Sequence, residues 1–434
     1  MSDIGSRTLA EFITLSKDGE WGKGEPFDDS VQMRVIRGTD FDKVRSGNWS
    51  GVPIRYVSRK HAELKALQDG DLLIETAGGS PGRPTGRTIF LRRGSISGQN
   101  LPVTCASFAR FIRLDPTLVE PEFVFWWLQH QYATRQLLAF HTQHTGVARF
   151  QWTTCSRSIV VPQVTRPNQR KIAAILSAYD DLIENNGHRI KLLEEMARRI
   201  YREWFVDFRY PGHEAVPRVD SELGPIPQGW EVSPVGSITQ ILGGGTPSKV
   251  VVEYWEPGTI TWFTPTDLTR ESAMFISASG SRISEQGLAK SSAKLFPPRA
   301  VMMTSRATVG VVAITTVPAA TNQGFITCVP TESVGTYHLY FWLIDQRDLI
   351  TSLASGATFR EINKATFRTI PFVKGSSEIE RQFEDYLEPF GLQILDLLRT
   401  QRTLLETRDL LLPRLISGDL NLTEVDIAML DLAA

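Results

Sequence analysis

Few side chains in this sequence have the types and spacing of catalytic or metal-binding groups. His141 and His144 stand three residues apart and could share one face of a helix, but no nearby cysteine or carboxylate completes a zinc site. Asp180 and Asp181 form no recognisable acid–base pair, and we interpret them as a solvated helix face. We therefore expect neither a metal site nor a catalytic residue in this chain.

The sequence lacks the usual motifs of nucleotide-binding proteins and of methyltransferases. The stretch LGGGTPSK, from Leu242 to Lys249, does not have the GxxxxGK[ST] spacing of a phosphate loop. We interpret it as a turn or a DNA-backbone loop, with a nucleotide loop as the alternative. No NPP[YF]-type methyltransferase tetrapeptide is present. The three cysteines (Cys105, Cys155 and Cys328) form neither a CxxC pair nor a disulfide framework, as expected of reduced thiols.

The positions of the charged residues are more informative than the net charge of the chain. Residues 76–114 and residues 286–331 contain no acidic side chain, although the whole chain has a net charge of −1. The cations in these stretches are Arg83, Arg87, Arg92, Arg93, Arg110, Arg113, Lys290, Lys294, Arg299 and Arg306. Arginine and lysine bind phosphates, arginine also reads guanine, and Asn322 and Gln323 could read adenine. DNA contact is our interpretation, and two ordinary cationic surfaces are the alternative.

Length and composition set the frame for these groups. With 434 residues, 41% hydrophobic and 22% charged, the chain is a folded protein of several domains. No apolar run approaches the roughly 20 residues of a membrane helix. The N-terminus lacks the basic and apolar regions of a signal peptide. We expect a cytoplasmic protein that has no contact with a membrane.

The chain repeats itself with a period of about half its length. The aromatic cluster at residues 123–128 returns at 338–343, and residues 71–76 return at 300–305. Thr39-Asp40-Phe41 returns as Thr266-Asp267-Leu268, and residues 192–194 return at 404–406. The matches keep the same order, so two tandem copies with loops of different length are indicated.

Each copy begins with short strand-like runs bounded by Gly, Pro and Asp. In the first copy these are MRVIRGTD, GDLLIETAGG, GRTIFLRR and ARFIRLDP; in the second they are TITWFTPTD, RAVMMTSR, GVVAITT and GFITCVPT. One helix interrupts each set, near residues 121–140 and 334–353. Closing strands are expected at Ser158–Pro162 and Arg368–Val373. The pattern predicts two mixed α/β domains within an α+β protein.

A long helix follows each globular part, because apolar residues recur with alternating spacings of four and three. Each helix covers about 40 residues, or roughly 60 Å. We expect the two to pack as an antiparallel coiled coil. The expected seam residues are Ile172, Leu176, Tyr179, Ile183, Ile190, Leu193, Ile200, Phe383, Leu387, Phe390, Ile394, Leu404 and Leu411. Asn186, Gln401 and Arg408 interrupt the stripe, and they either fix its register or turn to solvent.

The expected boundaries follow from these patterns. Globular domains cover residues 1–162 and 231–373, long helices 163–210 and 374–420, a linker with the entry to the second domain 211–230, and a tail 421–434. The linker is rich in Pro and Gly. Pro413 is expected to kink or end the second helix. The tail is acidic and apolar and is either a short docking helix or disordered.

The chain resembles the specificity subunit of a type I restriction–modification enzyme. The motifs NQRKIAAILSAYDDLI, GPIPQGWEV, LGGGTPS and LLLPRLISGDL, at their places in the half-chain repeat, carry the resemblance over essentially the whole sequence. It departs from the family where the first copy lacks an IPQGW entry, where Asn168 replaces an acidic residue, and where the second helix begins with the degenerate SSEIERQFEDYL.

The resemblance implies a non-catalytic subunit with two target recognition domains, each reading half of an asymmetric, split site in double-stranded DNA. It implies that the antiparallel helices set the spacer and dock two DNA adenine methyltransferase subunits, and that motor and nuclease subunits join the complex. S-adenosylmethionine and ATP would then belong to the partners, and this chain would bind no cofactor. We expect DNA contacts from Arg83, Arg87, Arg92, Arg93, Arg149, Thr246, Lys249, Arg270, Lys290, Lys294, Arg306, Asn322, Gln323 and Arg360. A two-headed scaffold for proteins or glycans is the alternative function.

Overall fold

The chain folds into two compact units. The computed structural model describes residues 7–78, 83–143, 147–271, 273–356 and 360–423. Unit 1 consists of residues 1–186 and 400–434, and unit 2 of residues 187–399. Each unit thus contains one globular half together with a part of both long helices, whereas the sequence analysis gave each helix a segment of its own.

The core of unit 1 is an antiparallel sheet of order β1-β8-β4-β6. A second sheet, β3-β2-β7, joins an antiparallel and a parallel pair, and a third has the order β5-β10-β9. The strands are β1 (Ile13–Asp18), β2 (Ser30–Ile36), β3 (Ile54–Ser58), β4 (Leu72–Glu75), β5 (Ala77–Gly78), β6 (Thr88–Phe90), β7 (Val103–Cys105), β8 (Ala109–Leu114), β9 (His141–Gln143) and β10 (Ala148–Phe150). In β8 the adjacent Phe111 and Ile112 are both buried, so the strand is covered on both faces, while Arg110 and Arg113 are half-buried.

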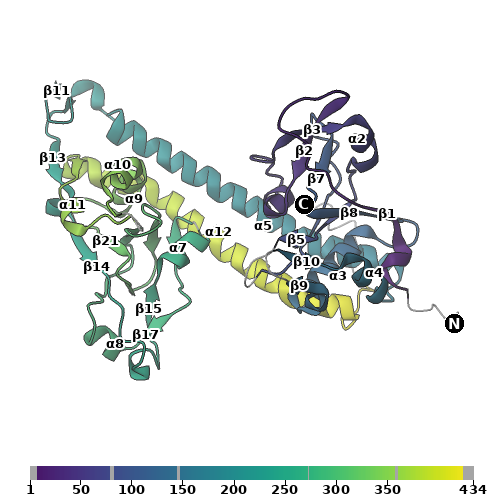
Figure 1. Cartoon of the computed structure of the whole chain (residues 1–434). Helices are drawn as coiled ribbons and strands as arrows, with labels where there is room; N and C mark the ends of the chain where they lie inside the picture. Colours follow the sequence, from purple (N-terminus) through teal and green to yellow (C-terminus); the bar gives the residue numbers. More distant parts are fainter. Residues whose placement is uncertain (1–6, 79–82, 144–146, 272, 357–359, 424–434) are drawn as a thin grey trace. The chain divides into compact units, whose positions relative to one another are not determined.

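Helices cover this sheet and join it to the long helices (Figure 1). The short ones are η1 (Leu9–Phe12), η2 (Gly38–Asp40), α1 (Phe41–Arg45), α2 (Arg59–Lys65), α3 (Pro121–Ala133), η3 (Gln136–Phe140) and α4 (Trp152–Ser158). The helix expected over residues 121–140 is divided by Arg135, whose φ of 60° breaks the helical path. The closing strand expected at Ser158–Pro162 is wrong, because α4 extends to Ser158 and only Val160 forms an isolated bridge.

Unit 2 repeats this plan with a sheet of order β14-β21-β18-β19-β16 and a second sheet of order β17-β15-β20. The strands are β11 (Arg218–Val219), β12 (Ile226–Pro227), β13 (Glu231–Pro234), β14 (Gln240–Gly243), β15 (Ile260–Phe263), β16 (Phe275–Ile276), β17 (Arg282–Ile283), β18 (Val301–Thr304), β19 (Val312–Thr315), β20 (Ala319–Thr321), β21 (Phe325–Val329) and β22 (Pro371–Lys374). The closing strand expected near residues 368–373 is present as β22, which pairs with β13.

The helices of unit 2 lie partly beside the long helices, as α9, α10 and α11 do, and partly at the other end with β15 and β17, where η6 packs against α8 (Figure 1). They are η4 (Arg202–Val206, a π-helix), η5 (His213–Ala215), α6 (Val235–Ile238), η6 (Val252–Tyr254), α7 (Pro265–Glu271), α8 (Glu285–Ala289), α9 (Thr336–Asp345), α10 (Arg347–Leu353) and α11 (Lys364–Arg368). The segment expected to be a linker is packed, because Tyr210, Ile226 and Trp230 are buried in the core of this unit.

Backbone pairing confirms the internal repeat. The parallel pair β2–β7 in unit 1 corresponds to β15–β20 in unit 2, and each has an antiparallel neighbour on its other side. Asp40 accepts a hydrogen bond from the amide of Arg37, and Asp267 accepts the equivalent bond from Thr264. The TDF and TDL motifs therefore recur because each aspartate stabilises the same turn.

The long helices are α5 (Arg166–Tyr201) and α12 (Ser377–Ser417). In unit 1 they are antiparallel, since Asp180 contacts Arg408 while Ile183, further along α5, accepts a bond from Gln401, earlier in α12. In unit 2, Ile190 shares a core with Phe383, Leu387 and Ile394. All thirteen expected seam residues are buried or half-buried, and many also pack on the globular halves.

Polar residues in the stripe face inward. Asn186 is buried, Gln401 donates to the Ile183 carbonyl at 2.9 Å, and Arg408 pairs with Asp180. Of the kink or end expected at Pro413, the end is wrong, because α12 continues to Ser417 with Leu412, Leu415 and Ile416 buried. The kink stays a prediction. In the described part of α12 and of every other helix, no stretch is long and apolar enough to cross a membrane. The tail beyond Thr423 lies outside the described residues.

Candidate nucleic-acid interface

Four loops of unit 2 meet at the ends of the main sheet. Gly245, in the LGGGTPS loop after β14, donates its amide to Thr321 at 2.8 Å. Thr246 donates its hydroxyl to the side chain of Gln323 at 2.7 Å. Ser305, after β18, donates to Gly324, and its carbonyl accepts from Ile362. The sequence-predicted residues Thr246, Asn322 and Gln323 are thus brought together with the segments that carry Arg306 and Arg360.

The side chains of Asn322 and Gln323, both in this group, differ in their hydrogen bonds and their exposure. Asn322 is half-buried and accepts the amide of Gly324 at 2.9 Å, so its oxygen shapes the turn. Gln323 is exposed, and its amide nitrogen remains available for a ligand. Of the two predicted adenine readers, only Gln323 therefore has a side chain directed to solvent.

The predicted cations of unit 2 fall into two classes. Arg306 forms an ion pair with Glu361 at 2.7 Å, and Arg270 lies 3.6 Å from Asp267. Arg360, Lys249, Lys290 and Lys294 are exposed. Among the described residues no ion pair holds these four. Lys290 is the C-cap of α8 and Lys294 follows it. Gly245 of the LGGGTPS loop lies against Ser292 and Ala293, so this lysine segment borders the same group of loops.

The arginines of the first acid-free stretch do not lack acidic partners. Arg87 pairs with Glu75 at 3.0 Å and is nearly buried, with 13% of its side chain exposed. Arg83 pairs with Asp42 at 2.6 Å, and Arg92 contacts Glu122 and Asp181. The DNA contacts expected of Arg87 and Arg92 stay predictions, and both guanidinium groups already pair with carboxylates of unit 1.

Three further arginines of the acid-free stretches also have acidic partners. Arg110 pairs with Asp18, Arg113 with Asp71 and Arg299 with Glu388, all at 2.7 to 2.8 Å. Of the predicted residues in unit 1, Arg93 and Arg149 are exposed and have no ion pair with a described residue. A stretch without acids in the sequence is therefore not a free cationic surface in the fold.

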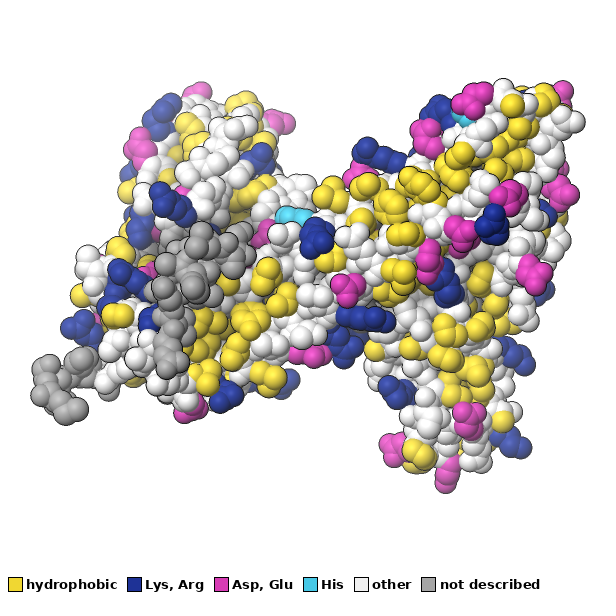
Figure 2. Space-filling model, turned by 180° about the vertical axis from the view of Figure 1, so that it is seen from behind, with side chains coloured by type: hydrophobic (Ala, Val, Ile, Leu, Met, Phe, Trp, Pro, Cys, Tyr) yellow, Lys and Arg dark blue, Asp and Glu magenta, His cyan; other side chains and the backbone are white. Residues whose placement is uncertain are grey.

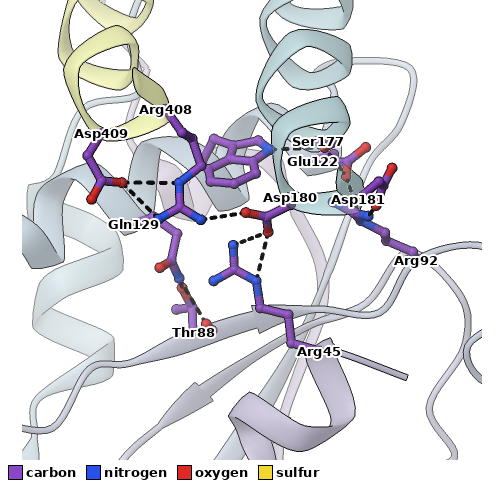
Figure 3. Close-up of polar contacts among 11 residues, drawn as sticks. Arg45, Thr88, Arg92, Glu122, Gln129, Ser177, Asp180, Asp181, Arg408 and Asp409 are labelled. Atoms are coloured by element: carbon purple, nitrogen blue, oxygen red, sulfur yellow. Dashed lines mark hydrogen bonds and ion pairs between the residues drawn. The ribbon is translucent and has the colours of Figure 1, made fainter. Parts of the chain in front are cut away.

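Figure 3 shows the acids that Arg92 contacts, together with the neighbouring Asp180. Asp180 of α5 accepts the Nε of Arg45 at 3.0 Å and the Nη1 of Arg408 at 2.5 Å, with only 12% of its side chain exposed. Asp181 contacts Arg92. The solvated helix face expected for Asp180 and Asp181 is wrong, because these carboxylates join α5 to the globular half and to α12 within unit 1.

An aromatic ring completes this junction. The Trp126 ring lies 5.4 Å from the guanidinium of Arg45 and 5.9 Å from that of Arg408. Its Nε1 donates to Ser177, which in turn donates to Glu122 at 2.6 Å (Figure 3 shows the latter residues). Burial raises the pKa of Glu122, although the bond from Ser177 and the charge of Arg92 oppose the rise. The junction fixes α5 and α12 on unit 1 and performs no evident chemistry.

The groups considered for metal binding or nucleophilic chemistry are not assembled. His141 Nδ1 lies 2.8 Å from the hydroxyl of Thr85, and His144 lies outside the described residues. Over residues 7–423, apart from the undescribed gaps, no group of three His, Cys, Asp or Glu side chains could hold a metal. Burial raises the pKa of Cys105, Cys155 and Cys328 to about 12, so these thiols are inert.

Charge on the surface is mixed. On the face seen in Figure 2, Lys and Arg side chains are interspersed with Asp and Glu, and hydrophobic side chains gather along the long helices. A broad single-sign field is absent from that face as far as the described residues show it. Recognition of an anionic ligand would therefore depend on individual loops.

Sequence reasoning missed the Ser107–Phe108 turn of unit 1. It occupies the place that Gln323–Gly324 has in unit 2, because Thr76 donates to Phe108 as Ser305 donates to Gly324, both at 2.8 Å. The repeat offset contained this signal, since residues 109–114 and 325–329 were already matched as strands. Charge alone directed the search to arginines.

Comparison with known proteins supplies the family. A family model described as the type I restriction modification DNA specificity domain matches residues 227–407. The MjaIX specificity subunit of Methanocaldococcus jannaschii, a type I restriction enzyme component, is 31% identical over 189 residues, which are 43% of this chain and 43% of that relative. The HindI specificity subunit of Haemophilus influenzae is 26% identical, covering 82% of this chain and 88% of the relative.

The chain is thus similar to type I restriction–modification specificity subunits, with the family model matching residues 227–407. A crystal structure of the S subunit from M. genitalium has the same fold, with a TM-score of 0.57, 13% identity and 95% of both chains covered. The α+β tandem architecture expected from the sequence is thereby confirmed. The equivalent loops of the two units, rather than the arginine-rich stretches as a whole, are the candidate nucleic-acid interface.

Proposed function

We propose that this chain is the DNA sequence-specificity subunit of a type I restriction–modification complex. The observation that carries the proposal is the repeated loop scaffold. Equivalent backbone bonds hold a turn at the same place in each unit, and the exposed side chains on that turn differ. Two heads of one design with different reading groups suit a DNA site whose two halves have different sequences.

Under this proposal the long helices have two roles, as a spacer between the recognition domains and as a docking surface for partner subunits. As a spacer, they would fix the gap between the half-sites, since DNA presents the same face about every 34 Å. As a dock, they would bind two DNA adenine methyltransferase subunits. Both units support docking with exposed apolar side chains on outward helix faces: Leu192, Met196, Tyr386 and Leu392 in unit 2, and Leu182, Leu405 and Leu410 in unit 1.

The chemistry would belong to the partners. S-adenosylmethionine would be bound by the methyltransferase subunits and ATP by motor and nuclease subunits, with this chain non-catalytic. The complex would act in the cytoplasm of a bacterium or archaeon, where the duplex DNA lies. No observation in the fold favours a scaffold for proteins or glycans over this function.

Methylome sequencing of a host that carries the chain with the methyltransferase of its own system tests the proposal. We expect methylated adenines in one bipartite, asymmetric motif with a fixed gap. Exchange of residues 1–162 for the first domain of another family member should change one half-site only. Methylation without a bipartite motif, or salt-independent binding to duplex DNA, would refute the proposal and favour the scaffold.

Insertion of one heptad in a long helix tests the spacer separately. The accepted gap should change while both half-sites keep their sequences, because the heads themselves are untouched. An unchanged gap in the methylome of the insertion variant would contradict the spacer role without affecting the reading role. An insertion of the same length in the exposed turn between β11 and β12 is the control, and it should leave the gap as it was.

A further inference from the structure

The turn between β7 and β8 of unit 1 is held rigidly from both sides. The carbonyl of Phe108 accepts the amide of Thr76 at 2.8 Å and that of Ala77 at 3.2 Å. Ala109 donates back to Ala106 at 2.9 Å. A turn with its backbone bonds satisfied in this way presents its side chains in one fixed position.

Phe108 is unusual among the aromatic residues of this unit. Its side chain is 62% exposed, whereas Phe111, Phe123, Trp126 and Trp127 are at most 3% exposed. A folding role does not require an exposed phenylalanine at a rigid turn, because burial would stabilise the fold more. Exposed aromatic groups held by a scaffold are typical of binding surfaces.

A hollow of about 400 Å³ opens beside this ring. Arg149, exposed on β10, lies at its edge, because Arg149 pairs with Ala77 in the β5–β10 ladder and Ala77 donates to Phe108. The acid of the hollow, Asp18, is bonded by Arg110 through both oxygens, at 2.8 and 2.9 Å. The negative charge is therefore neutralised, while the charge of Arg149 has no acidic partner among the described residues.

Unit 2 shows that this place tolerates different readers. Three backbone hydrogen bonds of unit 1 have equivalents in unit 2. The amide of Thr76 donates to the carbonyl of Phe108 as that of Ser305 donates to Gly324. In the same way Phe150 donates to Thr76 as Ile362 does to Ser305, and Glu20 donates to Cys105 as Gly245 does to Thr321. On that shared backbone, unit 2 exposes the polar Gln323 where unit 1 exposes Ser107 and Phe108. The scaffold is constant and the exposed chemistry varies, as expected at a position that determines specificity.

We propose that Phe108 reads one base pair of the half-site of unit 1 by an apolar contact that favours the methyl group of thymine, with Arg149 on the adjacent phosphate. The inference rests on the proposed function and deepens it. Apolar side chains select thymine through its C5 methyl group, and an arginine on phosphate positions the chain without reading sequence. In unit 2 the exposed reader is Gln323, which stands at the position of Ser107 on the equivalent turn, and its amide group suits adenine.

The test measures binding of the full chain, in complex with its methyltransferase, to duplexes that carry the methylome motif and every single base-pair change in it. Phe108→Ala should lose about tenfold of the preference at one position in the half-site that exchange of residues 1–162 alters. The salt dependence should stay the same, because no charge is removed. Arg149→Gln should weaken all duplexes equally and lower the slope of log K against log salt by about 1.

Two further variants complete the comparison. Gln323→Ala should relax one position in the other half-site only. Leu118→Ala, which shortens another apolar side chain of unit 1 (42% exposed) away from the hollow, should change neither preference nor affinity. Phe108 is exposed, so its replacement leaves the fold intact.

The outcomes distinguish the role of Phe108 from the DNA-specificity function of the chain. If the wild-type complex binds its motif and Phe108→Ala keeps the same ranking of duplexes, this inference is overturned and the proposed function stands. If the wild-type complex shows no motif at all, the proposed function fails and the inference fails with it.

Discussion

The two units fasten their globular halves to the long helices with different chemistry at comparable positions. In unit 1, Gln169 accepts the amide of Glu120 and donates to the carbonyl of Val164, five residues before it. In unit 2, Glu380 accepts the amide of Gly375, five residues before it, and pairs with the buried His338 at 2.9 Å. A neutral amide in one unit thus corresponds to an ionisable pair in the other.

A second carboxylate in each junction shows the same contrast between a group that does not respond to pH and one that does. Asp180 of unit 1 lies between two arginines, which stay charged at every physiological pH. Glu384 of unit 2 accepts the amides of Tyr337 and His338 at the start of α9, and burial raises its pKa to about 7. Unit 2 therefore carries the junction that responds to pH.

The distance to the nearest arginine explains much of the contrast. Burial raises the pKa of Glu122 in unit 1 as well, but Arg92 Nε lies 3.2 Å from its carboxylate and favours the charged form. For Glu384 the nearest guanidinium nitrogen, from Arg299, is 4.0 Å away, and Arg299 bonds Glu388 instead. The same fold can thus make a junction that is fixed or titratable by placing one arginine differently.

The largest effect is expected from Asp180→Ala. It leaves Arg45 and Arg408 without their shared carboxylate, and loss of one partner from a buried ion pair costs about 3 kcal/mol. Hydrogen exchange of the full chain, resolved by segment, should show faster exchange in unit 1 and little change in unit 2. A single melting temperature would not serve, because two units need not unfold together.

Glu388→Ala in unit 2 is the matched control. Its partner Arg299 is 43% exposed and Glu388 37%, so the loss should stay below about 1 kcal/mol. Equal losses in the two variants would contradict the contrast between a buried and an exposed junction.

The second effect concerns pH. The pKa of Glu384 rises from its ordinary 4.5 to about 7, so the folded state binds this proton more tightly than the unfolded state. Its contribution to stability is complete below pH 4.5 and is lost as the pH rises through 7. The loss should be about 2 kcal/mol, because the side chain keeps 21% of its surface exposed.

Hydrogen exchange of α9, corrected for the intrinsic rate, checks this by comparing pH 5.5 with pH 8. Glu384→Gln should remove most of the pH dependence in α9 and leave that of unit 1 unchanged. The comparison fails if wild-type α9 exchanges equally at both pH values.

Gln169→Glu would give unit 1 a titratable group of the kind found in unit 2. Gln169 is 5% exposed, and the ionised carboxylate cannot donate to Val164. We expect a loss of about 1.5 kcal/mol at pH 8, because a buried carbonyl is left without a donor. Part should return at pH 5, where the protonated carboxyl can donate again, whereas Gln169→Ala should lose stability equally at both pH values. Exchange rates of the α3 amides would decide between these outcomes.

Local patterns in the sequence predicted local structure well. The strands around residues 72–75 and 301–304, and the helix stripes from Ile172 and from Phe383, follow from periods that need only neighbouring residues. The course of α12 past Pro413 did not follow, because burial of Leu412, Leu415 and Ile416 outweighs the local preference of proline.

The candidate site was harder to predict, because its partners are distant in sequence. Arg92 and Asp181 are 89 residues apart, and Asp180 and Arg408 are 228 apart. An acid-free stretch therefore indicated free cations where the fold supplies acids from elsewhere in the chain, such as Asp181 for Arg92, Glu75 for Arg87 and Asp18 for Arg110. Phe108 escaped notice because a turn residue reveals its exposure only once Thr76 and Ala77 are known to hold it.

The smallest effect is expected where an ion pair lies wholly at the surface of unit 1. Arg83 is 53% exposed and its partner Asp42 75%, so Arg83→Ala should change the stability of unit 1 by less than about 0.5 kcal/mol. Arg87 stands four residues further along the chain. Arg87→Ala leaves Glu75 buried without its partner, so this substitution should lower the stability of unit 1 several times more. Since the two arginines stand in the same acid-free stretch, a measured difference would show that burial, and not the local sequence, decides which cations serve the fold. If Arg83→Ala instead weakens binding to all duplexes without loss of stability, Arg83 remains a candidate for phosphate contact while Arg87 does not.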